Sequence, residues 1–223
     1  MPFFRTEKGL VLFAHVPRCG GSSVENYLHG RFGKLGFLDR AFGKRPPDRR
    51  WHRTSPQHID RATLDRLIPL SFFAAQFTVV RHPLKRMQSV YLHNREVLGQ
   101  IPETQSFEEW LEDLPRQRRR DAGYLDNHAR PMTELVPGGT KVFRLEQGLK
   151  QVQDWLDELT GTTWPRDIGM VHSRAQLLKK KGTPALPHVL SPEAAEQVAA
   201  LYERDYDRFG YDPAAPNPEE TAP

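Results

Sequence analysis

Two short stretches of this sequence combine residue types that suit the binding of a phosphate or sulfate group. The first holds two adjacent glycines, two serines and an arginine, and consists of Arg18, Cys19, Gly20, Gly21, Ser22 and Ser23. Glycines let the backbone approach an anion closely, serines offer hydroxyl donors, and an arginine adds a fixed positive charge with a planar set of donors. Between a buried strand and a helix, such a loop predicts an anion site, because free backbone N–H groups and the helix dipole point at the ligand.

The second stretch begins with Arg81-His82-Pro83 and continues through Ser89. Pro83 is typical of the first turn of a helix, and Ser89 lies about two turns further along. The guanidinium of Arg81 and the hydroxyl of Ser89 could therefore converge on one phosphate. Arg86 is three residues before Ser89 and is its neighbour on the same helix.

The elements needed to position both stretches can be predicted from the surrounding pattern. The apolar run from Leu10 to Val16 is typical of a buried parallel strand. A helix is expected from Ser22 to Leu28, with Ser22 or Ser23 as its N-cap. A second buried strand is expected in the later part of residues 72–80, and helical periodicity follows from Leu84. The order strand, loop, helix therefore occurs twice.

Further elements continue this alternation. We expect a short helix capped by Asp60, an amphipathic helix over Ser106–Leu114, a strand over residues 141–145, a helix over residues 147–159 that ends near Gly161, and a helix from Ser191 to about Phe209. Strands that alternate with helices indicate an α/β fold of three layers, with a central, mainly parallel sheet flanked by helices. We expect one domain over residues 1–212 and a disordered tail over residues 213–223, which is rich in proline, alanine and glutamate.

The composition sets limits on location and partners. The chain has 223 residues, and its 32 lysines and arginines against 28 acidic residues give a net charge of +4. This mild excess does not predict nucleic-acid binding. Cys19 is the one cysteine, so no intrachain disulfide can form, and we expect a cytoplasmic protein. The first apolar run is too short to span a membrane, which predicts no membrane partner.

The residues of both stretches resemble motifs of one enzyme family. His15-Val16-Pro17 followed by Arg18–Ser23 is similar to the 5′-phosphosulfate loop of the carbohydrate sulfotransferase family, H-I-P-K-T-G-G-T-S. Arg18 replaces the usual lysine, and Cys19 replaces the usual threonine. The stretch from Arg81 to Tyr91 resembles the 3′-phosphate signature of that family, R-x-P-x-x-R-x-x-S-x-Y, with every specified position filled.

This resemblance implies a P-loop-like sulfotransferase fold and a reaction. The chain would transfer a sulfuryl group from 3′-phosphoadenosine 5′-phosphosulfate (PAPS) to an acceptor hydroxyl, on a carbohydrate by analogy. The loop Arg18–Ser23 would bind the 5′-phosphosulfate, and Arg18 would also assist the departing oxygen. Arg81 and Ser89 would grip the 3′-phosphate, and Arg86 would support the site. No metal ion is expected, because no His, Cys and acidic residues stand at ligand spacing.

A base is needed to take the proton of the acceptor hydroxyl, and a histidine with a pKa near neutrality suits this role. The chain has nine histidines. We predict His58, because related enzymes often carry a base just before the helix that leads to the second strand; an exposed loop histidine is the equal alternative. His128 and Arg130 are predicted to bind the acceptor, although a surface loop at a helix end would explain them almost as well. His15 is predicted to be packed and hydrogen-bonded.

Two alternative functions follow from the same residues. A P-loop kinase would need G-x-x-x-x-G-K-[S/T] and a carboxylate at a strand end for magnesium, and the sequence has neither. A degenerate family member could bind a nucleotide or glycan without turnover, because the usual lysine is replaced by Arg18. The arginines between Lys44 and Arg53 could line a groove for an anionic glycan, or could be ordinary surface charge.

Overall fold

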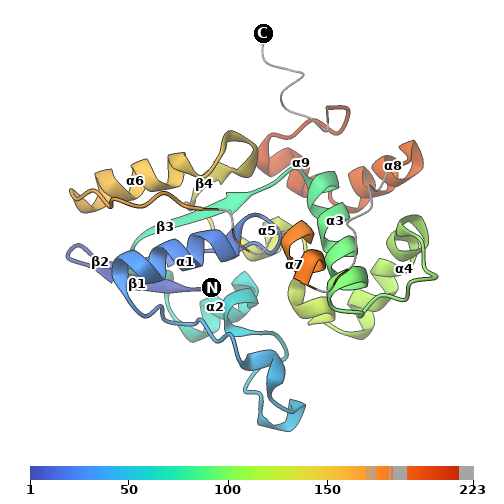
Figure 1. The fold of residues 1–223 in the computed structure, drawn as a ribbon, viewed down its shortest axis with the longest axis horizontal. Coiled ribbons are helices and arrows are strands. Elements are labelled where there is room, and N and C mark those ends of the chain that lie inside the picture. Colours follow the sequence, from blue (N-terminus) through green and yellow to red (C-terminus); the bar gives the residue numbers. More distant parts are fainter. Residues whose placement is uncertain (170, 172–173, 181, 183–189, 216–223) are drawn as a thin grey trace. The chain divides into compact units, whose positions relative to one another are not determined.

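The computed structural model describes residues 1–169, 171, 174–180, 182 and 190–215 (Figure 1). Two compact units are formed: unit 1 contains Met1–Val80 and Met132–Val171, and unit 2 contains Arg81–Pro131 and the described part of His172–Pro223. The expectation of one domain over residues 1–212 stays a prediction. Residues 216–223 of the predicted tail lie outside the described residues.

Unit 1 is built on a four-stranded sheet in the order β1-β2-β3-β4. The strands are β1 (Phe3–Thr6), β2 (Gly9–Phe13), β3 (Phe73–Val80) and β4 (Lys141–Arg144). β2 pairs in parallel with β3, and β3 with β4, whereas β1 pairs with β2 in the antiparallel sense. The mainly parallel sheet is thereby confirmed. β1 was not predicted, because its four residues show only a short apolar pair followed by a charge.

Within the described part of unit 1, four α-helices accompany this sheet, as the predicted α/β fold requires (Figure 1). They are α1 (Gly21–Phe32), α2 (Arg61–Leu67), α5 (Met132–Leu135) and α6 (Lys150–Thr160). The Phe32 ring of α1 stacks on Phe4 of β1 with centroids 4.4 Å apart, and the Trp155 ring of α6 lies 5.2 Å from that of Phe77 in β3. Aromatic burial of this kind contributes strongly to packing. The Arg31 guanidinium, paired with Asp157, joins α1 to α6.

Three helix caps were predicted in unit 1, and the structure confirms two of them. The Asp60 carboxylate accepts a hydrogen bond from the Thr63 N–H at 2.8 Å, so the cap of α2 is confirmed. Gly161 ends α6 in the left-handed conformation, also as predicted. The predicted serine cap of α1 is wrong. Gly20 is the N-cap, with φ 79°, and no side chain caps the helix. The turn into α1 needs the left-handed backbone that glycine adopts freely, so both serines fall inside the first turn.

Unit 2 is helical and has its own apolar core. Its helices are α3 (Pro83–Leu92), α4 (Phe107–Arg120), α7 (Arg174–Lys180), α8 (Pro192–Leu201) and α9 (Glu203–Phe209). The core gathers Tyr91, Trp110 and Tyr202, each no more than 1% exposed. α4 begins with a capping box between Ser106 and Glu109, which confirms the predicted start.

The predicted single helix from Pro192 to Phe209 is wrong, because Tyr202 interrupts it. This residue leaves helical geometry, with φ −122° and ψ 23°, so that α8 ends and α9 begins at its two sides. Its buried hydroxyl donates to the Ala129 carbonyl at 2.7 Å. Among the described residues, no helix has both the length and the apolar character to cross a lipid bilayer.

Candidate functional site

The loop Arg18–Ser23 forms the sharp turn between β2 and α1 in unit 1. The Ala14 N–H still donates to the Phe77 carbonyl of β3 at 2.8 Å, so the chain leaves the sheet only after this residue. Arg18 has φ 68°, a left-handed conformation that is uncommon for a residue with a Cβ atom. The Gly20 carbonyl accepts from the N–H groups of Ser23 and Val24 and thereby opens α1. The N–H groups of Gly21 and Ser22, which precede these two in the first turn, lie where anion sites use backbone donors.

The side chains of this loop point in different directions. Cys19 is fully buried, and its Sγ lies 3.8 Å from the Pro17 carbonyl, so only its backbone can face a ligand. Ser23 is also buried, and its Oγ accepts from the Val171 N–H at 3.0 Å. Ser22 is exposed. The predicted loop residues therefore lie together in one turn, but the Ser22 hydroxyl is the accessible one of the two serines.

A buried histidine and a buried glutamate lie directly beneath this loop. His15 Nδ1 is 2.6 Å from Glu25 Oε1 on α1, and both residues are 5% exposed. The prediction that His15 is packed and hydrogen-bonded is confirmed. A Cβ atom added to Gly21 would lie 1.9 Å from His15 Nε2. The position of the ring therefore depends on glycine at the start of α1.

The protonation states of this pair follow from burial and mutual contact. Desolvation lowers the pKa of His15 below its ordinary value and outweighs the opposing effect of the Glu25 carboxylate. Burial by itself would raise the pKa of Glu25, but the hydrogen bond and charge of His15 prevail, so that this pKa is lowered. We therefore describe the pair as a neutral imidazole that donates from Nδ1 to an ionised carboxylate.

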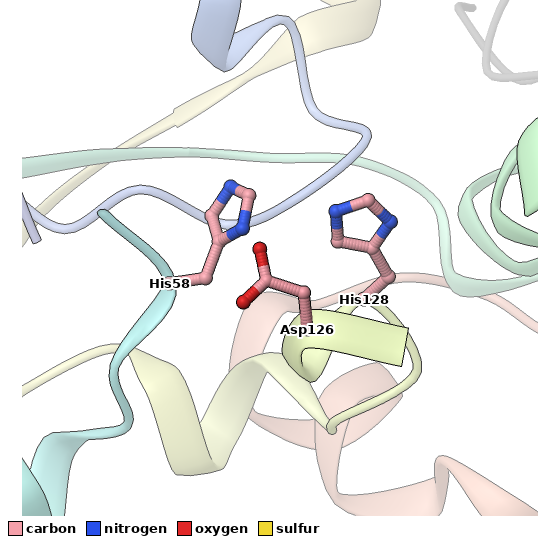
Figure 2. A group of neighbouring side chains, drawn as sticks. All are labelled: His58, Asp126 and His128. Carbon is pink, nitrogen blue, oxygen red and sulfur yellow. The ribbon is translucent and has the colours of Figure 1, made fainter. Parts of the chain in front are cut away.

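His58 extends this pair toward the turn Pro56–His58. The His58 and His15 rings meet edge to face, with centroids 4.8 Å apart. His58 Nδ1 lies 3.1 Å from Ser55 Oγ, and the His58 N–H donates to the Ser55 carbonyl at 2.9 Å. Figure 2 shows the His58 side chain projecting from this turn. When Nδ1 donates to Ser55, Nε2 carries the lone pair that a base requires.

Unit 2 contains the second predicted stretch. Arg81 follows directly after β3, and α3 begins at Pro83 as predicted. Arg81 and Ser89 are both partly exposed. Arg86 is completely buried, and its Nη2 donates to the carbonyls of His128 and Arg130, at 2.8 Å each. Arg86 thus holds the backbone of the segment that contains two predicted acceptor residues.

That segment has an unusual backbone. Leu125, Asp126 and Asn127 are consecutive residues with φ of 51°, 55° and 62°. Left-handed conformations are costly for residues other than glycine, so a run of three must be held by its surroundings. The Arg86 bonds described above and the Tyr202 hydroxyl on Ala129 supply that restraint. Asp126 is half-buried and projects from the segment beside His128 (Figure 2).

The predicted acceptor residues are partly engaged within this segment. His128 is 8% exposed, with Nδ1 3.5 Å from Asn94 Nδ2. The Arg130 guanidinium donates to Asn127 Oδ1 at 2.9 Å and to the Ala122 carbonyl at 2.6 Å. Their role toward an acceptor stays a prediction.

The sequence analysis did not identify Glu25 and Asp126 as candidate site residues. A signal for Glu25 was available, because it is an acid next to Val24 and three residues before Leu28, two apolar positions of the predicted helix. No comparable signal exists for Asp126, because its geometry depends on the distant residues Arg86 and Tyr202.

Comparisons with known proteins give one clear result. No curated protein and no solved structure matches the chain. The model of the sulfotransferase family matches residues 1–212, which include Arg18–Ser23, Arg81–Tyr91 and every predicted site residue. A match over so much of the chain agrees with the mainly parallel sheet and with the strand, loop and helix that carry Arg18–Ser23. The chain therefore belongs to the sulfotransferase family.

Proposed function

We propose that the chain transfers a sulfuryl group from PAPS to a hydroxyl group of a carbohydrate. Membership of the sulfotransferase family supports sulfuryl transfer in general. The observation that carries the choice of donor is the turn between β2 and α1, in which Arg18 and the N-cap Gly20 precede a twelve-residue helix that begins at Gly21. Such a turn suits the phosphosulfate end of the nucleotide, because backbone donors and a guanidinium converge on it.

Five of the six loop residues have a proposed task. Arg18 donates to the oxygen that bridges phosphorus and sulfur and stabilises the negative charge that develops there. Gly20 and Gly21 allow the backbone to approach the phosphosulfate, and Cys19 contributes through its backbone, since its Sγ is buried. Ser22 offers the accessible hydroxyl.

The 3′-phosphate is assigned to unit 2. We propose that the Arg81 guanidinium and the Ser89 hydroxyl bind it, because a paired arginine and hydroxyl match the charge and donors that a phosphate requires. Arg86 supports the neighbouring backbone of residues 128–130 and does not reach the ligand itself, in keeping with its complete burial.

The proposed reaction is a single displacement at sulfur. The acceptor oxygen forms a bond to sulfur while the bond from sulfur to the bridging oxygen of the 5′-phosphate breaks. His58 Nε2 takes the proton of the acceptor hydroxyl, and the bridging electron pair remains on 3′-phosphoadenosine 5′-phosphate (PAP). Ser55 orients the His58 ring through the contact at Nδ1. His128 and Arg130 are proposed to contact the acceptor.

The first experiment measures nucleotide preference by thermal shift and calorimetry. PAP should stabilise the protein more than AMP does, because only PAP carries the 3′-phosphate. Arg81→Ala should weaken PAP binding about tenfold or more, consistent with loss of a charged hydrogen bond. Arg5→Ala, at an exposed position of β1, is the matched control and should bind as the wild type does. Equal affinity for PAP and AMP would refute the proposal.

The second experiment measures turnover with labelled PAPS. Arg18→Ala should abolish sulfate transfer, whereas Arg81→Ala should act mainly through donor binding. A wild-type protein that binds PAP but transfers no sulfate to any sugar or phenol would identify a degenerate member of the family, the alternative raised by the arginine at position 18.

A further inference from the structure

Unit 1 has a pocket that the proposed chemistry does not use. It is an open depression with a volume of about 450 Å³, lined by Phe37, Leu38, Asp39, Trp51, Pro56 and Leu67. This volume falls in the range of small-molecule sites. Two of the lining residues are among the most exposed large apolar side chains of the described chain, Trp51 at 54% and Leu67 at 47%. Exposed apolar groups that gather in one concave place usually mark a binding site.

The walls of the pocket are fixed to the rest of unit 1. Gly36 exchanges two backbone hydrogen bonds with Phe3 of β1, at 3.1 and 2.8 Å, and so anchors the segment that leads to Phe37. The Phe37 ring meets the Trp51 ring at 72°, with centroids 5.9 Å apart. The Asp39 N–H donates to Gln57 Oε1 at 3.2 Å and ties this wall to the turn Pro56–His58. The indole of Trp51 is therefore presented on a supported surface.

The pocket adjoins the predicted base along the chain. Pro56 forms part of its wall, and His58 is the last residue of the same three-residue turn. A ligand that fills the pocket would therefore lie against the turn that carries the His58 imidazole.

The segment that runs from the lining residue Asp39 through Trp51 to Arg53 is strongly positive. Residues 39–53 contain six lysines and arginines and two aspartates, an excess equal to the net charge of +4 of the whole chain. Asp39, the acidic residue of the lining, is paired with Arg45, and the hydrogen bond from Arg45 lowers the pKa of that carboxyl. The pocket's own carboxylate is thus neutralised by a partner, and Arg49 and Arg53, which flank Trp51 in sequence, are exposed.

We infer that this pocket binds an anionic sugar ring of the acceptor, with the ring stacked on Trp51 and its carboxylate facing the arginines of residues 40–53. A pyranose has a face of C–H groups that complements the electron-rich face of an indole. The surrounding cations select a charged sugar over a neutral one. The choice of a sugar as the ligand rests on the proposed function. The inference adds that the acceptor is an anionic sugar and that it binds at this pocket of unit 1.

Binding can be measured by calorimetry without any donor nucleotide. The probe is a short oligosaccharide of alternating glucuronate and N-acetylglucosamine, and its methyl ester is the matched neutral ligand. We expect saturable binding of the acid and at least tenfold weaker binding of the ester. Trp51→Ala should weaken binding of the acid at least tenfold, a typical result for an aromatic anchor. Phe72→Ala, which removes a ring that is 64% exposed and outside the lining, should bind as the wild type does.

A charge variant tests the second half of the inference. The double change Arg49→Gln and Arg53→Gln should reduce the preference for the acid over the ester, and added salt should do the same. Both changes are at exposed positions, so the thermal melting point should stay at the wild-type value.

Three results would overturn the inference. These are equal binding of acid and ester, unchanged binding by Trp51→Ala, and tighter binding of 4-nitrophenol than of the sugar, which would identify a phenolic acceptor. PAP binding in the same protein separates the two proposals. A protein that binds PAP but not the sugar refutes the pocket alone, and one that binds the sugar but does not prefer PAP over AMP refutes the proposed donor.

Discussion

Gly21 offers the sharpest test of the buried pair beneath the Arg18–Ser23 loop. Replacement by alanine would place a Cβ atom 1.9 Å from Nε2, 2.3 Å from Cδ2 and 2.5 Å from Cε1 of His15. Real Cβ atoms do not approach so closely, so the ring must move. His15 is 5% exposed, stacks on Phe13 and bonds to Glu25 at 2.6 Å, so movement breaks favourable contacts.

The magnitude follows from three contributions. Overpacking a tight site costs about 1–3 kcal/mol. Loss of a hydrogen bond to a buried charged group costs about 1.5–3 kcal/mol. Alanine in place of glycine in a helix recovers about 0.5–1 kcal/mol. Gly21→Ala should therefore lower the free energy of unfolding by about 2–5 kcal/mol.

Urea unfolding followed by circular dichroism measures this effect, and α1 supplies its own control. Gly30 lies in the same helix, is exposed, and has no atom within 4 Å of an added Cβ. Gly30→Ala should therefore leave stability unchanged or raise it by about 0.5–1 kcal/mol. If Gly21→Ala is as stable as Gly30→Ala, the described contact between His15 and α1 is wrong.

A double-mutant cycle identifies the cause. In a His15→Ala background the ring is absent, and the methyl group of Gly21→Ala has room. The cost of Gly21→Ala should then fall close to zero, which corresponds to a coupling of at least about 2 kcal/mol. A cost that persists in this background would mean that some group other than His15 resists the methyl group.

Two further predictions concern unit 2 and the dependence of stability on pH. Arg86→Lys should destabilise the protein by about 2–4 kcal/mol in urea, because one ammonium group cannot serve the carbonyls of both His128 and Arg130 in the geometry of the guanidinium; Arg95→Lys, at an exposed hydrogen bond, is the control and should change stability little. The pKa values of His15 and Glu25 are both lowered in the folded state, so the unfolded chain binds more protons than the folded chain does in acid. The contribution of this pair to the free energy of unfolding should therefore be fully present above about pH 6.5 and should be lost progressively toward about pH 4. The assigned charge states would be contradicted if the urea midpoint stayed constant or rose on acidification. They would also be contradicted if the dependence of the midpoint on pH were the same in Glu25→Gln as in the wild type.

Features with local causes could be predicted from the sequence. Asp60, Ser106 and Gly161 act as helix caps through residues within one turn, and all three were identified. The parallel strands that precede both motifs also show in the apolar runs. β1 was not predicted because its four residues are too few to show a strand pattern of apolar residues, although pairing with β2 stabilises them.

Features that depend on distant partners could not be predicted. The break at Tyr202 accompanies a hydrogen bond to Ala129, and nothing in the local sequence indicates it. Likewise, the pocket around Trp51 brings together residues from 37 to 67, and its lining was not foreseen, although the arginines between Lys44 and Arg53 were noticed. The contact of His15 with Glu25 lies between these cases. His15 was predicted to be hydrogen-bonded and a sequence signal for Glu25 was available, but their contact depends on how α1 packs on the sheet.

The left-handed run at Leu125, Asp126 and Asn127 has a consequence for sequence choice at its centre. Glycine at position 126 would adopt φ 55° without steric penalty, whereas aspartate accepts roughly 1 kcal/mol or more of strain there. The chain thus combines a less favourable backbone conformation with a carboxylate side chain at this point. Library designs that favour thermal stability would select glycine here, and the resulting proteins would gain melting temperature while losing the one acidic group that this bend presents.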